Sequence, residues 1–137
     1  MSEIIFISGG ARSGKSSFAE KIARDYSRPT AYIATSIPFD RGMEERIKRH
    51  RDSRPRDWET IEAYKDFVGL SDNESFLKSE LILLDCVTLM ITNNMMDANL
   101  DFENMDYEGL DKLEESIRQE VDILFKLIRD ANKIGIV

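Results

Sequence analysis

The chain has 137 residues, of which 42% are hydrophobic and 33% charged. This composition is typical of one soluble globular domain (residues 1–137) with a buried core, and no apolar stretch reaches the roughly 18 residues of a membrane-spanning helix. One cysteine and one histidine exclude an internal disulfide, argue against a structural zinc site and fit a reducing cytoplasm. The net charge of −7 comes from the second half, since residues 71–137 carry 6 Lys and Arg against 15 Asp and Glu, and this acidity argues against a nucleic-acid partner.

The first strong pattern is an apolar strand, Ile4–Ile7, that runs into a glycine-rich turn. From Gly9 to Ser16 the sequence reads G-x-x-x-x-G-K-S, the P-loop pattern. Glycines let backbone N–H groups approach a phosphate chain closely, and the N-terminus of the following helix attracts the same anion. Lys15 is placed to reach the β- and γ-phosphates, and Ser16 to bind Mg²⁺. The predicted nucleotide-binding residues of this loop are Gly9, Gly10, Ala11, Arg12, Ser13, Gly14, Lys15 and Ser16.

A helix and a second strand follow the P-loop. Phe18, Ile22 and Tyr26 recur at four-residue spacing with Ala19 and Ala23 beside them, which predicts that this face packs on a sheet, and Arg28-Pro29 ends the helix. Thr30–Ala34 is predicted to be a strand. Thr35 and Ser36 then stand at its carboxyl end, where ligands bind in open α/β sheets. A ligand contact and an ordinary loop or capping role both remain open for these two residues.

Residues 40–53 are predicted to form an unusual basic helix. Met43, Ile47 and His50 share one face of it. The surrounding cations are Arg46, Lys48, Arg49, Arg51, Arg54 and Arg56. A neutral imidazole is a competent nucleophile toward phosphorus, and nearby arginines stabilise charge on the transferred group. The alternative is a solvated charged helix that carries a partly buried histidine.

The segment from Trp58 to Glu62 alternates with a period of two, which predicts a short strand. Glu62 could hold a ribose hydroxyl or face water. Residues 64–79 are predicted to form a short helix and a polar loop.

Leu81–Leu84 form a second apolar strand that ends in Asp85. This is the Walker-B arrangement, in which the aspartate holds Mg²⁺ beside the P-loop hydroxyl, so Ser16 and Asp85 are the predicted metal ligands. The alternative role for Asp85 is the N-cap of the apolar helix that begins at Cys86.

Two further elements are predicted near the end of the chain. A long amphipathic helix carries its apolar stripe on Leu110, Leu113, Ile117, Val121, Leu124, Ile128 and Ala131. We expect this stripe to be core rather than a partner-binding surface. Ile134–Val137 begins another strand.

Taken together, the sequence resembles the bifunctional adenosylcobinamide kinase/adenosylcobinamide-phosphate guanylyltransferases of cobalamin biosynthesis. The matching stretches are Gly9–Ser16, Tyr32–Ser36, Met43–Pro55 with Trp58 and Glu62, Leu83–Thr88 and Asn93-Asn94. The combination of Gly-Gly-Ala-Arg-Ser-Gly-Lys-Ser with Ile-Ala-Thr-Ser and Arg-His-Arg is far more specific than a P-loop alone.

The resemblance implies two reactions at one nucleotide site. The family phosphorylates the hydroxyl of the aminopropanol arm of adenosylcobinamide with ATP or GTP, and then transfers GMP from GTP to that phosphate. His50 would be the nucleophile that becomes linked to GMP, and Lys15 would act in catalysis. Outside the P-loop, the residues implied to bind guanine nucleotide are Thr35, Ser36, Arg51, Asp52, Ser53, Arg54, Glu62 and Asp85. Two alternatives are a simple small-molecule P-loop kinase and a non-catalytic nucleotide-binding remnant.

The resemblance also implies the fold and the assembly. We expect an α/β domain of the P-loop NTPase type (RecA-like), with a mostly parallel sheet flanked by helices. Relatives continue for some tens of residues beyond the strand that begins at Ile134, so we expect the C-terminal strands to be missing here and the chain to be a fragment or a truncated protein. Family members often carry Glu where this chain has Asp85. Homo-oligomerisation as a trimer is also implied.

Overall fold

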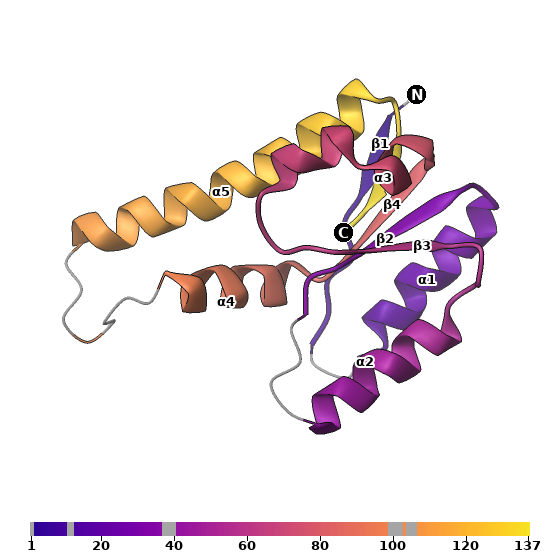
Figure 1. Cartoon of the computed structure of the whole chain (residues 1–137), viewed down its shortest axis with the longest axis horizontal. Helices are drawn as coiled ribbons and strands as arrows, with labels where there is room; N and C mark the ends of the chain where they lie inside the picture. The colour runs from indigo at the N-terminus through magenta and orange to yellow at the C-terminus, as the bar shows by residue number, and fades with distance from the viewer. Residues whose placement is uncertain (1, 11–12, 37–40, 99–102, 104–106) are drawn as a thin grey trace.

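The backbone forms one parallel sheet with helices on both faces (Figure 1). The computed structural model describes residues 2–10, 13–36, 41–98, 103 and 107–137, and for His50 it describes the backbone alone. Among these residues the strands are β1 (Glu3–Ile5), β2 (Thr30–Ala34), β3 (Glu59–Glu62), β4 (Leu81–Asp85) and β5 (Ile134–Ile136).

The strand order is β1-β5-β4-β2-β3, and every pair of neighbours is parallel. Parallel strands require crossover connections, which explains why helical segments separate these strands in the sequence. The last strand is inserted into the middle of the sheet, with Gly135 opposite both Ile4 of β1 and Ile82 of β4. The expected α/β P-loop class is confirmed, and the described strands are all parallel rather than mostly so.

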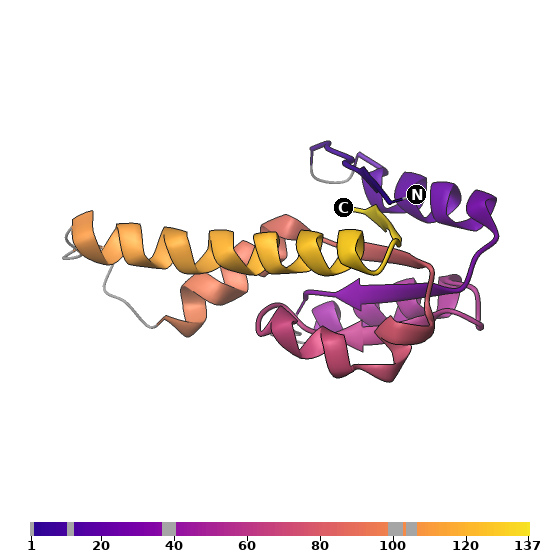
Figure 2. The ribbon, with the colours of Figure 1, turned by 90° about the horizontal axis from the view of Figure 1, so that it is seen from above.

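The helices divide between the two faces of the sheet. They are α1 (Lys15–Tyr26), α2 (Arg41–Ser53), the short 3-10 helix η1 (Phe67–Asp72), α3 (Glu74–Lys78), α4 (Val87–Asp97) and α5 (Tyr107–Asp130). Figure 1 shows α1 and α2 on one side of the sheet and α5, η1 and α3 on the other. Viewed from above, the first half of α5 runs out beyond the sheet (Figure 2).

Each face of the sheet has its own core, because alternate strand residues point to opposite faces. On the α5 side, Ile33, Ile82 and Leu84 pack with residues of η1, α3, α4 and α5. On the α1 side, the buried cluster consists of Ala19, Ala23, Tyr32, Leu81, Leu83, Ile134 and Ile136. Strands β2 and β4 therefore contribute buried residues to both cores, whereas the isoleucines of the predicted strand Ile4–Ile7 are only half-buried.

Two predictions about helix faces need correction. In α1 the predicted face is buried at Ala19 and Ala23, beside buried Glu20, and Ile22 and Tyr26 pack against the same core, but Phe18 is 55% exposed. In α5 the predicted stripe is fully buried only at Leu124 and Ile128, and Leu110 is 42% exposed. Ala131 of that stripe lies beyond the end of α5 and is exposed.

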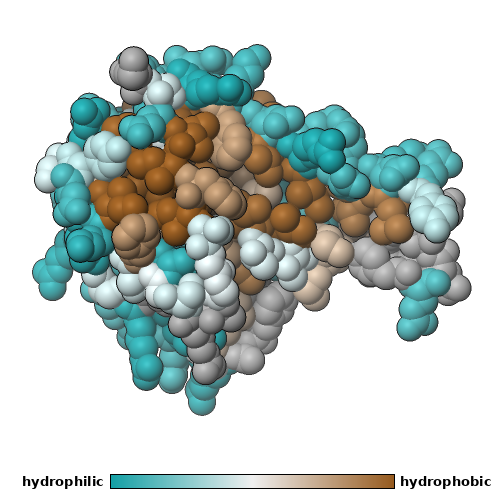
Figure 3. All heavy atoms as spheres, turned by 180° about the vertical axis from the view of Figure 1, so that it is seen from behind, coloured by the Kyte–Doolittle hydropathy of each residue, from teal (hydrophilic) through white to brown (hydrophobic). Residues whose placement is uncertain are grey.

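Apolar side chains gather on the face opposite to that of Figure 1 and continue along the projecting helix (Figure 3). Strand β1 forms one edge of the sheet, and Phe6, which follows it, is 71% exposed. None of the helices that the structure describes combines the length and the apolar character needed to cross a bilayer.

Candidate functional site

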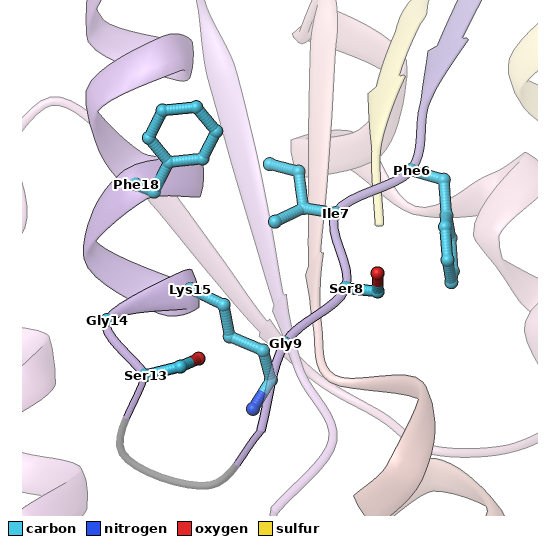
Figure 4. Close-up of a pocket in the computed structure, with 8 residues that line it drawn as sticks. All are labelled: Phe6, Ile7, Ser8, Gly9, Ser13, Gly14, Lys15 and Phe18. Carbon is cyan, nitrogen blue, oxygen red and sulfur yellow. The ribbon is translucent and has the colours of Figure 1, made fainter.

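The P-loop joins β1 to α1 and surrounds a hollow of about 520 Å³. Ser8, Gly9, Ser13, Gly14 and Lys15 line this hollow, together with Phe6, Ile7 and Phe18. In Figure 4 the ammonium group of Lys15 reaches back across the loop toward Gly9. A lysine at the first position of α1 thus brings its charge to the helix N-terminus, where partial positive charge already accumulates.

Two glycines explain the shape of this loop. Gly14 is the N-cap of α1 and has φ of 87°, a left-handed conformation that costs other residues about 1–2 kcal/mol. A Cβ atom on Gly9 would lie 2.6 Å from the Ser13 hydroxyl oxygen, so any other residue there would force the Ser13 side chain to move. Ala11 and Arg12, which were also predicted to bind nucleotide, lie outside the described residues.

Asp85 lies beside the start of α1. The hydroxyl of Ser16 donates a hydrogen bond to Oδ1 of Asp85 at 3.3 Å. The hydroxyl of Tyr32 donates to the other carboxylate oxygen, Oδ2, at 2.6 Å. The carboxyl end of β4 and the first turn of α1 therefore bring together the two residues that the sequence predicted as metal ligands.

Arg54 connects the end of α2 to this group. Its guanidinium carbon lies 3.7 Å from the centre of the Tyr32 ring, and both side chains are buried, with 7% and 4% of their surfaces exposed. The pKa of Arg54 is lowered by burial, and the charge of Glu20 on α1 offsets only part of this shift. Burial and the neighbouring Asp85 carboxylate raise the pKa of Tyr32 far above its ordinary value, so its hydroxyl stays protonated.

Thr35, which directly follows β2, has no exposed surface. Its hydroxyl donates to the carbonyl oxygen of Cys86 at 2.7 Å and accepts from the Cys86 backbone N–H at 2.8 Å. The amide of buried Asn93 donates to the Thr35 carbonyl oxygen at 2.6 Å. The Thr35 hydroxyl is therefore engaged with the β4–α4 connection, whereas Ser36 is half-buried.

The remaining predicted residues lie on or near α2. Arg51 forms an ion pair with Glu62 of β3, with Nη2 and Oε1 at 2.7 Å and both side chains more than half exposed. Asp52 and Ser53 are exposed at the end of α2, and the backbone of His50 lies one turn before Arg54. The predicted face of α2 is half-buried at Met43 and Ile47.

This arrangement suits Mg²⁺ that is bound together with a nucleotide. No cluster of three or more His, Cys, Asp or Glu side chains suited to a metal occurs in the part of the chain that the structure describes. Mg²⁺ is commonly held by one or two carboxylates together with substrate phosphates and water. The adjacent oxygen atoms of Ser16 and Asp85 fit that mode, in which the nucleotide supplies the other ligands.

Sequence reasoning missed the contacts of Tyr32 and Asn93. Tyr32 was interpreted as a β-prone residue of a buried strand, yet its hydroxyl reaches the Asp85 carboxylate. A tyrosine in a mostly apolar strand, two residues before the carboxyl end of that strand, is a signal that could have prompted the search. Asn93 gave no comparable signal, because its partner is a backbone carbonyl 58 residues away in the sequence.

Comparison with known proteins places the chain in a family. A family model described as cobinamide kinase / cobinamide phosphate guanyltransferase matches residues 5–137. Two relatives are bifunctional adenosylcobalamin biosynthesis proteins CobU, from Escherichia coli and Salmonella typhimurium. They are 35% and 34% identical to this chain, and each alignment covers 96% of this chain and 76% of the relative. Among solved structures, flagellar accessory protein FlaH of Methanocaldococcus jannaschii aligns with 98% of this chain and 59% of its own, at a TM-score of 0.48 and 18% identity. On the strength of the family match and the two relatives, the chain belongs to the cobinamide kinase / cobinamide phosphate guanyltransferase family.

Proposed function

We propose that this chain is an adenosylcobinamide kinase and adenosylcobinamide-phosphate guanylyltransferase that acts in the cytoplasm as a homotrimer. It phosphorylates the hydroxyl of the aminopropanol arm with ATP or GTP, and then converts the phosphate to adenosylcobinamide-GDP with GTP. The observation that carries the proposal is the position of Asp85, 3.3 Å from the P-loop hydroxyl of Ser16, in a chain that matches the family over residues 5–137.

In the kinase reaction, the P-loop residues bind and orient the triphosphate. Backbone N–H groups of the loop and the N-terminus of α1 face the phosphate oxygens, and Lys15 adds a cation there. Ser16 and Asp85 would hold Mg²⁺, which when bound neutralises charge on the phosphate oxygens. The substrate hydroxyl attacks the γ-phosphorus and gives up its proton to solvent, the bond from the γ-phosphorus to the bridging oxygen breaks, and the nucleoside diphosphate leaves.

In the guanylyltransferase reaction, we propose that His50 is the nucleophile. Its neutral imidazole attacks the α-phosphorus of GTP, a P–N bond forms, and pyrophosphate leaves. An oxygen of adenosylcobinamide phosphate then attacks the same phosphorus and releases the imidazole. Ser36, Arg51, Asp52, Ser53, Arg54 and Glu62 are the residues proposed to bind the guanine nucleotide beside the P-loop, with Thr35 holding the backbone next to them.

Labelled nucleotide tests this proposal. Incubation with α-labelled GTP and Mg²⁺ is expected to leave acid-labile label on the protein, and His50→Ala is expected to remove it. Because the chain has one histidine, the loss of label identifies the residue. Glu45→Ala, an exposed position on the same helix, is the matched control and is expected to keep the label.

Transfer of label from γ-labelled ATP to adenosylcobinamide measures the kinase reaction separately. We expect His50→Ala to retain this transfer. Kinase activity without protein label in the unsubstituted chain would identify a simple P-loop kinase. Nucleotide binding with neither reaction would identify a non-catalytic remnant. Light scattering of the purified chain measures its molar mass, and a mass three times that of one chain is expected for the proposed trimer.

A further inference from the structure

We propose that Tyr32 is a positioning residue that orients Asp85 for the metal ion bound with the nucleotide. This inference rests on the proposed function, because it concerns the same phosphate site. Tyr32 lies on β2, one strand away from Asp85, and its side chain passes between the sheet and the helices α1 and α2. Its hydroxyl reaches one oxygen of the carboxylate, and the P-loop hydroxyl of Ser16 reaches the other.

The two oxygen atoms of Asp85 have different partners. Oδ2 accepts from the Tyr32 hydroxyl at 2.6 Å, and Oδ1 accepts from the Ser16 hydroxyl at 3.3 Å. A short hydrogen bond to a charged oxygen is among the stronger ones in proteins. Tyr32 therefore fixes the carboxylate through Oδ2 and leaves Oδ1, which has the longer bond, directed at the P-loop.

Arg54 restricts Tyr32 in turn. Its guanidinium group lies over the tyrosine ring, with the guanidinium carbon 3.7 Å from the ring centre, and the attraction between a cation and an aromatic face is stronger at a buried site than at an exposed one. The positive charge also draws electron density from the phenol and makes its hydroxyl a better hydrogen-bond donor. The end of α2, one turn after His50, is thus linked through Arg54 and Tyr32 to Asp85.

A second tyrosine–aspartate pair in the chain shows what a purely structural contact looks like. Tyr64 donates to Asp97 at the same distance of 2.6 Å, but Lys65 also pairs with that carboxylate at 2.8 Å. The charge of Asp97 is therefore matched by a neighbouring ammonium group. Among the hydrogen bonds and ion pairs that the structure describes, the Asp85 carboxylate has no ammonium partner and accepts from the neutral hydroxyl groups of Ser16 and Tyr32.

The test compares nucleotide binding with and without metal. A fluorescent GTP analogue is titrated into the full chain in excess Mg²⁺ and in EDTA. The Kd in EDTA divided by the Kd in Mg²⁺ measures how much the metal contributes to binding. Tyr32→Phe keeps the ring and removes the hydroxyl. We expect the ratio to fall by about tenfold, as for the loss of other groups that orient metal ligands, while the Kd in EDTA stays unchanged. Tyr64→Phe is the matched control and is expected to keep the ratio of the unsubstituted chain.

Arg54→Met provides an independent measurement that leaves the tyrosine hydroxyl in place. If Arg54 acts through Tyr32, this change lowers the ratio of the Kd in EDTA to the Kd in Mg²⁺, and it has no further effect on that ratio in the Tyr32→Phe background. Should Tyr32→Phe fail to fold, the response of the ratio to Arg54→Met decides the matter alone.

The outcomes separate this inference from the proposed function. A chain that binds the analogue with Mg²⁺-dependent affinity, but whose ratio is the same after Tyr32→Phe, overturns the role of Tyr32 and leaves the nucleotide site intact. A chain that binds no nucleotide under either condition overturns both. A lower ratio in Tyr32→Phe with labelling of His50 unaffected at saturating Mg²⁺ supports both.

Discussion

At Thr35, one hydroxyl group satisfies both polar groups of the Cys86 backbone. The side chain has no exposed surface, so water cannot replace it. A second buried contact, from the Asn93 amide to the Thr35 carbonyl oxygen, ties the same position to α4. The residue thus contributes to the site by fixing the backbone that follows Asp85.

Thr35→Val keeps the shape of the side chain but leaves the N–H and C=O groups of Cys86 without this partner. We expect a loss of about 1–3 kcal/mol in the free energy of unfolding, measured by urea denaturation, because buried polar groups are left unsatisfied. Thr35→Ser retains the hydroxyl and is expected to lose less. Equal losses in the two variants would show that the methyl group, and not the hydrogen bonds, stabilises this position.

The residue scale also shows what a sequence can reveal about a site. Spacing alone predicted that Ser16 and Asp85 would meet, because a P-loop and a Walker-B strand end at the same edge of a parallel sheet. The contact between Tyr32 and Asp85 was not predictable in this way. It depends on the lateral order of β2 and β4 and on how far a side chain reaches, which no local pattern encodes.

Among the elements, α5 is attached to the domain by its second half. Besides the buried Leu124 and Ile128, it presents Glu120, whose carboxylate accepts from the backbone N–H groups of Asp66 and Phe67 at 3.1 and 3.0 Å. Those two groups lie at the start of η1, where helical N–H groups have no partner within the helix. Glu120 of α5 thus caps η1, which begins more than 50 residues earlier in the chain.

Glu120→Ala removes this cap, and we expect the free energy of unfolding to fall by about 2 kcal/mol, since two hydrogen bonds to a charged group are lost. The amide protons of Asp66 and Phe67 should also exchange faster with solvent, as hydrogen exchange measures directly. Glu115→Ala is the matched control, because Glu115 is exposed and accepts only from Gln119 on the same helix among the hydrogen bonds described. If both variants lost the same stability, the cap would have no specific role.

Element boundaries were largely predictable, because apolar runs and periodicity are local properties of the chain. The strands Thr30–Ala34 and Leu81–Asp85 agree with the predicted ranges, and the strand predicted at Ile4–Ile7 is observed as Glu3–Ile5. The predicted face of α1 holds at Ala19 and Ala23, with Ile22 and Tyr26 packed against them, but not at Phe18, which is 55% exposed. Which row of a helix faces the sheet depends on the closeness of packing, and the sequence carries no direct measure of it.

For the molecule as a whole, the two parts of the described sheet are joined by β5. β5 lies between β1 and β4, so the P-loop strand is joined to the other described strands through residues 134–136. Backbone hydrogen bonds continue this pairing to the loop, from the Ile7 N–H to the Val137 carbonyl oxygen at 2.8 Å. The geometry of the phosphate site, encoded near the N-terminus, therefore depends on the final residues described.

Ile136→Ala tests this dependence. Ile136 has no exposed surface, so we expect a loss of about 2–5 kcal/mol in the free energy of unfolding from the cavity that the change leaves. Because β5 connects the two parts of the sheet, far-UV circular dichroism and the fluorescence of Trp58, which packs in the α1-side core, should report the same lowered transition midpoint. Val68→Ala, at a position 65% exposed, is the control and should change stability by less than about 0.5 kcal/mol. A Trp58 transition that stays at its original midpoint while circular dichroism shifts would show that the β2–β3 side of the sheet folds independently of the P-loop strand.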